Sequence, residues 1–203
     1  MYHIITIERP YASGGSEIGK KLAEALGYKL LDRSILTEAA KNLDIPAIYI
    51  NNLDETSSGS FMLNLSKTTR GKGKRNENEN YLPMAEKLFA EEKRIIEKAA
   101  DEGGCVIVGR AAGYILKDRK DCLRVFVHAD KEFRIQRAIE KEGINRADAE
   151  NTIKKIDKRR KGFFDSVTEW KWGNLKFFEL CFDSSKLGIE LCTKLLVEAV
   201  LKS

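Results

Sequence analysis

Five short apolar runs, interspersed with segments of helical periodicity, limit how this chain can fold more than any other feature. The runs read HIITI (3–7), YKLL (28–31), CVIVG (105–109), LRVFVHA (123–129) and FFELCFD (177–183). Strands that alternate with helices favour a parallel sheet, because each parallel connection needs a crossover segment that covers one face. The sequence therefore predicts an α/β fold with a parallel sheet and helices on both of its faces.

The segments between and after these runs differ in their capacity to pack. Helical periodicity predicts a helix that ends at Gly27 and further helices over 35–43, 84–99, 131–141, 146–165 and 187–201. The stretch TTRGKGKRNENEN, by contrast, has almost no side chains that could enter a core. Burial therefore cannot offset its conformational entropy, and we expect residues 54–80 to be poorly ordered without a ligand.

The composition is that of one globular domain. A chain of 203 residues with 42% hydrophobic and 33% charged residues can build a substantial core and remain soluble. No apolar run is long enough to cross a bilayer, and the first residues do not resemble a signal peptide. A net charge of +5 indicates anionic ligands only weakly. We therefore expect no membrane association, and the sequence carries no signal for an oligomeric state.

Cysteine usage points to a reducing compartment. Cys105, Cys122, Cys181 and Cys192 show no CxxC pairing, and two or three of them fall in apolar stretches where a small buried thiol fits. The simplest expectation is a reduced, cytoplasmic protein.

The segment between the first strand and the first helix has the composition of a phosphate-binding loop. A literal match to GxxxxGK runs from Gly14 to Lys20, but it would begin the helix at Lys20 and leave only about two turns before Gly27. It would also remove Ile18 from the apolar face of the helix. A register that runs from Arg9 to Ser16 avoids both problems. We therefore predict that the strand ends near residues 7–8 and that the helix begins near residues 15–16.

In this register the loop backbone can still hold phosphate. The amides of Ser13, Gly14, Gly15 and Ser16, together with the helix N-terminus, would bind a nucleotide phosphate, and the Ser16 hydroxyl would contact Mg²⁺. Gly15 occupies the position at which such loops usually carry a lysine. The alternative is a Gly/Ser turn between strand and helix that binds no ligand.

Two cations are candidates for the missing lysine. Arg9 leaves the strand beside the loop, and Lys20 lies one helical turn beyond Ser16 with a side chain that leans back toward the helix N-terminus. We predict that Arg9 and Lys20 act together in catalysis, because the β- and γ-phosphates need positive charge rather than one particular residue. The alternative for Lys20 is a solvated side chain paired with Glu24.

Arginines follow two of the predicted strands and recur in the long basic helix. Arg110 follows CVIVG at the edge where open α/β sheets bind ligands, so it is a candidate for substrate binding. Arg134 and Arg137, early in the helix after LRVFVHA, and Arg159 and Arg160 would close over the transferring phosphoryl group, and of these Arg134, Arg137 and Arg160 are the candidates for catalysis. The alternatives are that Arg110 caps strand carbonyls and that the basic run KKIDKRRK is a solvated face.

Other polar and aromatic side chains leave more than one role open. Asp32, followed by Arg33 at the end of the second strand, could hold a Mg²⁺-bound water or cap the next helix. Asp157 could orient Arg160 from one helical turn away. The tryptophans of WKWG could form a wall for a base, although a packed corner is the more common outcome.

Several segments resemble the cytidylate kinase-like family of P-loop nucleoside monophosphate kinases. These segments are IITIERPYASGGSEIGKKLAEALGYKLLDR, CVIVGRAAGYIL, LRVFVHADKEFRIQR, DKRRKGFF, WKWG and FFELCFDSSKLGIE. The resemblance implies a single P-loop kinase domain over 1–203, with three layers, a five-stranded parallel sheet, an acceptor-site insertion at 45–83 and a lid-like region at 142–176. It also implies that ATP and Mg²⁺ are bound, and that Asp32, Arg33 and Arg110 face an acceptor nucleotide.

The chain departs from the family pattern at several positions. It has Ala12 where the loop usually has glycine, Ser16 where it often has arginine, and phenylalanines where tyrosines are frequent, namely Phe163, Phe164, Phe177 and Phe178. The family resembled here also lacks the lysine of the loop, so its absence is shared.

These observations favour an ATP-dependent phosphotransferase that acts on a nucleoside monophosphate, with CMP suggested by the resemblance only. A nucleotide-binding regulator without catalysis, built on the same fold, is the main alternative, and turnover measurements would separate the two. An RNA-binding module is disfavoured, because the aromatics at 163–172 lack the spacing of a stacking sheet and the net charge is small.

Overall fold

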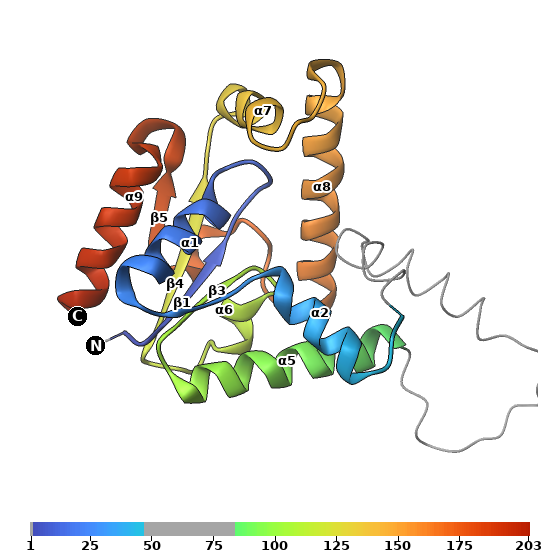
Figure 1. The fold of residues 1–203 in the computed structure, drawn as a ribbon, viewed down its shortest axis with the longest axis vertical. Helices are drawn as coiled ribbons and strands as arrows, with labels where there is room; N and C mark the ends of the chain where they lie inside the picture. The colour runs from blue at the N-terminus through green and yellow to red at the C-terminus, as the bar shows by residue number, and fades with distance from the viewer. Residues whose placement is uncertain (1, 47–83) are drawn as a thin grey trace, which may run out of the picture.

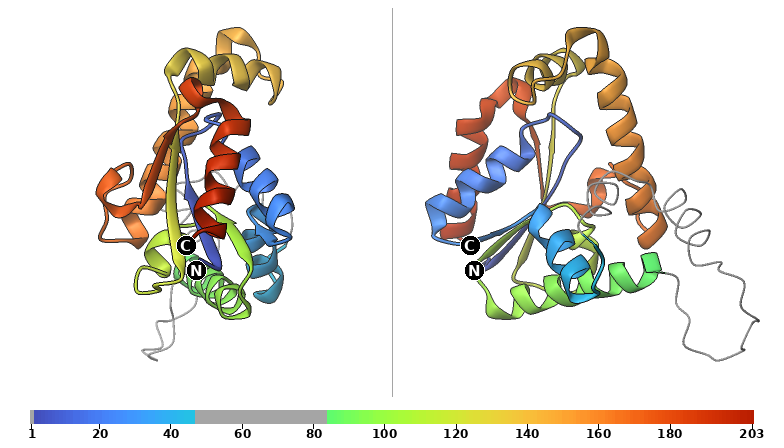
Figure 2. Two further views of the ribbon diagram at one scale, coloured as in Figure 1. Left: turned by 90° about the vertical axis from the view of Figure 1, so that its left-hand side faces the viewer. Right: turned by 45° about the vertical axis from the view of Figure 1, so that its right-hand side comes forward.

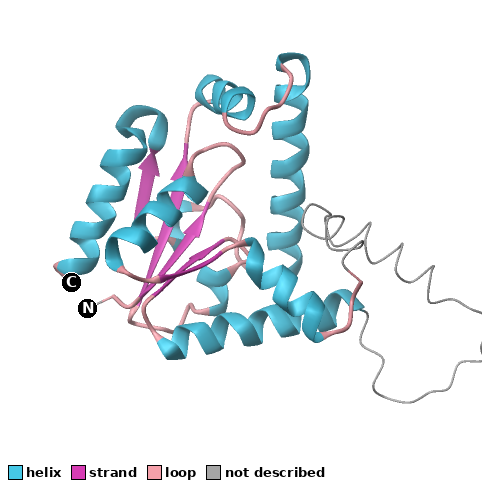
Figure 3. Ribbon diagram, in the orientation of Figure 1, coloured by secondary structure: helices cyan, strands magenta, loops and turns pink. Residues whose placement is uncertain are grey.

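The structure is a computed structural model that describes residues 2–46 and 84–203. Its centre is a five-stranded sheet in the order β2-β3-β1-β4-β5, in which every neighbouring pair is parallel. Figures 1 and 3 show the strands running in one direction toward the same edge. The strands are β1 (Ile4–Glu8), β2 (Lys29–Leu31), β3 (Cys105–Val108), β4 (Cys122–His128) and β5 (Leu180–Asp183).

Helices cover both faces of this sheet. The helices of the described residues are α1 (Gly15–Leu26), α2 (Arg33–Asn42), α5 (Met84–Glu102), α6 (Ala112–Ile115), α7 (Lys131–Glu140), α8 (Arg146–Val167) and α9 (Ser184–Leu201). α1 and α9 pack against each other on one face, while α2, α5 and α6 share a core on the other. α7 and α8 lie beyond the carboxyl ends of the strands (Figures 1 and 2). The chain therefore has the three-layer architecture that the resemblance implied.

The central strand shows why the sequence folds this way. All five residues of β1 are buried, with Ile5 and Ile7 facing the core beneath α1 and α9, and Ile4 facing the core beneath α5. Successive side chains of a strand point to opposite faces, so a strand covered on both faces needs the continuous apolar run seen here.

The predicted elements are present, with adjusted ends. β1 ends at Glu8 and α1 begins at Gly15, which confirms the predicted loop register and rejects the literal match. β5 is shorter than predicted, because a 3₁₀ turn occupies Leu175–Phe177. A first turn capped by Asp183, whose carboxylate accepts from the Ser185 amide at 3.0 Å, begins α9 at Ser184. A kink follows at Gly188 (φ 74°, ψ 161°), so the rest of α9 begins close to the predicted residue 187.

Two further predictions concern parts of the chain outside this core. The segment expected to be poorly ordered, 54–80, lies outside the described residues, as does nearly all of the 45–83 insertion. Within the residues described, no helix combines the length and the apolar character needed to span a membrane.

All four cysteines are free thiols. Cys105, Cys122 and Cys192 are buried, and Cys181 is exposed. Burial raises the pKa of Cys105 to about 11 and that of Cys122 to about 12, so both remain protonated at neutral pH. The expectation of small buried thiols is therefore met by three of the four.

Candidate functional site

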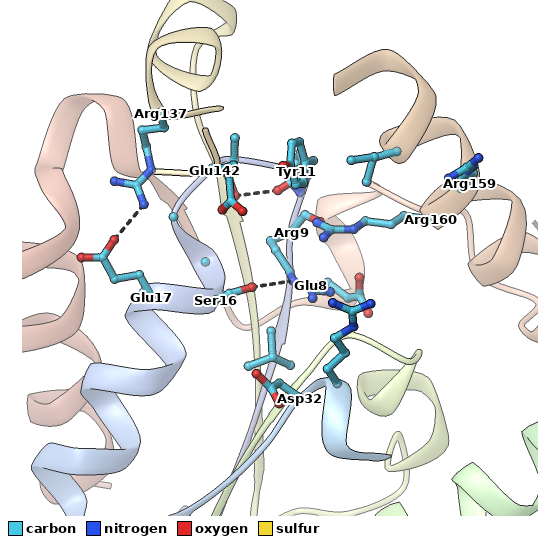
Figure 4. A pocket seen from close by; sticks show the side chains of 18 of the residues that line it. Glu8, Arg9, Tyr11, Ser16, Glu17, Asp32, Arg137, Glu142, Arg159 and Arg160 are labelled. Atoms are coloured by element: carbon cyan, nitrogen blue, oxygen red, sulfur yellow. Dashed lines mark hydrogen bonds and ion pairs between the residues drawn. The ribbon is translucent and has the colours of Figure 1, made fainter. Parts of the chain in front are cut away.

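A cavity of about 420 Å³ opens at the carboxyl edge of the sheet, between the β1–α1 loop, the end of β3 and helix α8. Figure 4 shows side chains that line it. Seven cationic and four acidic side chains line it, namely Arg9, Arg33, Arg110, Arg137, Lys141, Arg159 and Arg160, and Glu8, Glu17, Asp32 and Glu142. The excess of positive charge suits an anionic ligand.

The β1–α1 loop presents the start of a helix to this cavity. Gly14, the N-cap of α1, has a φ of 83°, and no side chain caps the helix. The first amides of a helix have no partner within it, so those of α1 are placed to bind an anion. Ser13 is buried and holds the loop, because its Oγ lies 2.9 Å from the Pro10 carbonyl oxygen and its own carbonyl accepts from Ser184 Oγ at 2.6 Å.

The two candidates for the missing lysine lie in different places. Arg9 lines the cavity, and its Nε donates to Ser16 Oγ at 3.4 Å (Figure 4). Lys20 is not among the described residues that line the cavity. Its side chain is 67% exposed, and its Nζ lies 3.9 Å from the Glu24 carboxylate. The structure therefore brings Arg9 to the loop and places Lys20 in the solvated pair that was its alternative.

Arg110 is held rigidly at the end of β3. Its Nη2 donates to both carboxylate oxygens of Glu92 at 2.5 Å, and its guanidinium lies 4.0 Å from the centre of the Phe163 ring. The Glu92 side chain is 0% exposed and that of Arg110 is 15% exposed. Arg110 and Ala111 both have positive φ, 56° and 54°, a conformation that costs free energy and is concentrated at functional sites.

Arg134 contacts the loop rather than the cavity. Its Nε donates to the Tyr11 carbonyl oxygen at 2.8 Å, and its Nη2 pairs with the Asp157 carboxylate. The same carboxylate accepts from the Tyr11 amide at 2.7 Å. Arg134 and Asp157 thus bind both backbone groups of one loop residue. We call this arrangement the Tyr11 clamp.

Arg137 of α7 and both Arg159 and Arg160 of α8 do line the cavity. Arg137 donates through Nη2 to the Glu17 carboxylate at 2.7 Å (Figure 4). Arg160 donates through Nη1 to the Arg9 carbonyl oxygen at 3.2 Å, and Arg159 lies beside it on α8. Among the described residues, Nε of Arg110 and Nε of Arg137 are buried without a hydrogen-bond partner.

Asp32 and Arg33, at the start of α2, also line the cavity. Asp32 caps α2, because its carboxylate accepts from the Ser34 amide at 3.4 Å. The helix cap, one of the two roles left open by the sequence, is therefore present, and the position of Asp32 also allows contact with a ligand.

The sequence analysis missed Glu8, the last residue of β1. It is buried, it lines the cavity, and its Oε2 accepts from Trp172 Nε1 at 3.3 Å. Trp170 stacks on Phe177 with ring centres 4.3 Å apart. Neither tryptophan is among the described residues that line the cavity, so WKWG forms a packed corner there rather than a wall for a base.

The comparisons with known proteins agree with this geometry. A family model described as the cytidylate kinase-like family matches residues 4–186. The chain belongs to that family. The comparison with curated proteins found no match.

Solved structures support the fold of this family member. An uncharacterized protein from Eubacterium ventriosum matches with a TM-score of 0.73 and 26% identity, over 98% of this chain and 99% of the other. A shikimate kinase from Acinetobacter baumannii, in complex with shikimate, matches with a TM-score of 0.53 and 13% identity, over 100% and 94%. A shikimate kinase from Bacteroides thetaiotaomicron has a TM-score of 0.52 and 12% identity, over 98% of each chain. The chain therefore has a P-loop kinase fold.

P-loop kinases of this kind generally use ATP and Mg²⁺, and the site has groups that fit both. The uncapped start of α1 suits phosphate, and Mg²⁺ prefers oxygen ligands, with one or two protein groups completed by phosphates and water. Ser16 Oγ accepts one hydrogen bond from Arg9 and keeps a second lone pair, and Asp32 offers a carboxylate on the same cavity. Within the described chain no group of three or more His, Cys, Asp or Glu side chains could hold a metal by itself.

The Tyr11 clamp leads to a stability prediction for this family member. We expect Asp157→Ala to lower the free energy of unfolding by about 2 kcal/mol or more, because it leaves the part-buried Arg134 and the Tyr11 amide without this partner. Urea denaturation of the two proteins measures the difference.

Glu150→Ala is the matched control. Glu150 of α8 also pairs with α7, through Lys131, and with Lys154 one turn along α8. Both pairs lie on the exposed surface, where ion pairs contribute little. Equal urea-denaturation midpoints for Asp157→Ala and Glu150→Ala would show that the Tyr11 clamp does not stabilise the loop.

Proposed function

We propose that this protein transfers the γ-phosphoryl group of ATP to the phosphate of a nucleoside monophosphate. One observation carries the proposal: the uncapped helix start of the β1–α1 loop and the anchored Arg110 lie on one cavity lined by seven cationic side chains. Phosphoryl transfer needs little covalent participation by protein, but it needs alignment and positive charge around the phosphate oxygens. CMP is the first acceptor to test, on the basis of the family.

Different residues of the cavity would bind the phosphates of the donor and of the acceptor. The amides of Gly14, Gly15 and Ser16 would hold the donor phosphates, and Ser16 would contribute a hydroxyl to Mg²⁺. Bound Mg²⁺ would neutralise part of the charge on the donor phosphates. Arg110, fixed by Glu92, would bind the acceptor phosphate through its remaining donors.

The reaction balances without a protein base. An anionic oxygen of the acceptor phosphate supplies the electron pair for the new P–O bond. The bond between the γ-phosphorus and the bridging oxygen breaks, and its electron pair leaves with ADP. Arg137, Arg159 and Arg160 would stabilise the charge on the transferring group, since all three line the cavity.

A regulator that binds nucleotide without turnover is the second candidate. It is favoured by the carboxylate partners that three arginines already have, Arg110 with Glu92, Arg134 with Asp157 and Arg137 with Glu17. Arginines committed to carboxylates have fewer donors left for phosphate. In this case ATP would bind and remain intact.

A nucleotide panel tests the proposal. Melting temperatures are measured with ATP, GTP, CMP, UMP, AMP and GMP, with and without Mg²⁺, because a ligand of the native state raises the melting temperature by mass action. Formation of ADP is then followed with each monophosphate. We expect stabilisation by Mg²⁺–ATP and turnover with at least one monophosphate. Stabilisation without turnover would favour the regulator, and the absence of any ATP effect would refute both.

A further inference from the structure

The Arg9 side chain lies between Gly15 and Gly109, and fits there because neither residue has a side chain. A Cβ atom built on Gly15 would lie 2.8 Å from Arg9 Cβ and 3.0 Å from Arg9 Cγ. A Cβ atom built on Gly109, directly after β3, would lie 2.2 Å from Arg9 Nη1. Contacts this short do not occur between real side chains, so neither glycine can carry a side chain while Arg9 lies there.

The exclusion at Gly15 is one of space alone. Gly109 has a φ of 79°, which favours glycine for a second reason, but Gly15 is not among the residues with positive φ. Gly15 is the first residue of α1, and apart from Arg9 the nearest atom to a Cβ built there is Val127 Cβ, at 3.3 Å. Arg9 and a side chain at position 15 are therefore mutually exclusive.

The direction of the Arg9 side chain places its charge between the start of α1 and the end of β3, which both border the cavity. The side chain runs from the end of β1 past Ser16, with Nε 3.4 Å from Ser16 Oγ, and its guanidinium reaches Gly109, the residue before Arg110 (Figure 4). It thus connects the start of α1, where donor phosphates would bind, with the end of β3, where the acceptor would bind.

We propose that Arg9 supplies the positive charge at the transferring phosphoryl group, and that Gly15 lacks a side chain because Arg9 takes the space a lysine there would use. This inference rests on the proposed function. The cation of the loop then comes from Arg9, the first residue after β1, and not from residue 15, the first residue of α1, where such loops usually carry a lysine. A planar guanidinium in this position can donate to two phosphate oxygens at once, which a lysine cannot.

The same geometry separates Arg9 from its competitors. Lys20 lies on the exposed face of α1 beside Glu24. Arg137 reaches the loop from α7, where its guanidinium lies beside Gly14 and is bound to Glu17. Of these three, only Arg9 has its charged group against the end of β3.

The first test is a set of single variants. The dissociation constant for Mg²⁺–ATP is measured by titration calorimetry for Arg9→Ala, Arg9→Lys, Lys20→Ala and the control Lys98→Ala. Lys98 lies on α5, 69% exposed, beside Glu102. We expect Arg9→Ala to bind roughly 10- to 100-fold more weakly, the loss of one charge-assisted contact, and Arg9→Lys to recover part of that loss.

The second test exchanges the two positions. Gly15→Lys alone should bind ATP at least as weakly as Arg9→Ala, because the new side chain meets Arg9. The double variant Arg9→Gly with Gly15→Lys removes the collision and restores a cation. It should bind ATP at least tenfold more tightly than either of its two single variants, a coupling that independent sites do not show.

The results of these tests distinguish a wrong assignment of Arg9 from a wrong proposed function. If the wild-type protein binds Mg²⁺–ATP and Arg9→Ala binds it equally well, or if Lys20→Ala loses more, the assignment of Arg9 is wrong while the proposed function stands. If the wild-type protein binds no ATP, both fail. If Gly15→Lys does not fold, the comparison of Arg9→Ala with Lys98→Ala still decides.

Discussion

Glu92→Ala is expected to lower the free energy of unfolding by about 3 to 5 kcal/mol, the cost of leaving a buried arginine without its carboxylate. Glu92 is 0% exposed, and both of its carboxylate oxygens accept from Arg110, which is itself 15% exposed. For a chain of this length each kcal/mol shifts the melting temperature by roughly 2 to 4 °C. Calorimetry should therefore show a decrease of at least about 6 °C.

A control and a double variant make this result specific. Glu97→Ala, on the same helix but 49% exposed and beside Lys93, should change the free energy of unfolding by less than about 0.5 kcal/mol. The double variant Glu92→Met with Arg110→Met should recover most of the stability, because apolar residues of similar volume can replace a buried ion pair. Equal stability of Glu92→Ala and Glu97→Ala would contradict this account of the pair.

The second large effect concerns the acceptor. If the proposed function is correct, Arg110→Ala should reduce kcat/KM for the monophosphate by roughly 10- to 100-fold, since it removes a charge-assisted contact to the acceptor phosphate. The dissociation constant for Mg²⁺–ATP should change by less than about threefold, because Arg110 lies at the end of β3 and not on the β1–α1 loop. Initial-rate kinetics with each substrate varied in turn measure both quantities.

Arg94→Ala is the matched control for Arg110→Ala. Arg94 also pairs with a glutamate of α5, Glu91, but it is 59% exposed and does not line the cavity. Its kinetics should match the wild type. Because Arg110→Ala leaves Glu92 buried without that partner, rates are compared at a temperature where both variants are folded. A loss of ATP affinity with an unchanged KM for the monophosphate would place Arg110 on the donor side instead.

Local patterns were sufficient for much of the fold. The register of the β1–α1 loop follows from Ile18 and Leu22, because both must face the core and this sets where the helix begins. The central strands were predictable for the same reason, since their continuous apolar runs need cover on both faces. The short helix α6 was not predicted, because four residues carry too little periodicity to be recognised.

The partners of the charged side chains were much less predictable. Arg134 was expected over the phosphoryl group, but it binds Tyr11 and Asp157, which lie on the loop and on α8. Lys20 had two open roles, and only the direction of its side chain in the folded chain distinguishes them. Sequence spacing identifies neighbours along one helix. Arg134 instead contacts a loop residue 123 positions away and a residue of a different helix, and the position of Lys20 depends on side-chain direction.

The sequence by itself determined that a glycine-rich loop connects a buried strand to an amphipathic helix without its usual lysine, because every residue of that unit lies within about 20 positions. Only the tertiary structure decided that Arg9 lies against Gly15 and Gly109. That arrangement depends on the pairing of β1 with β3, which brings together residues about 100 positions apart. Packing between distant elements, rather than any local pattern, sets where this charge lies.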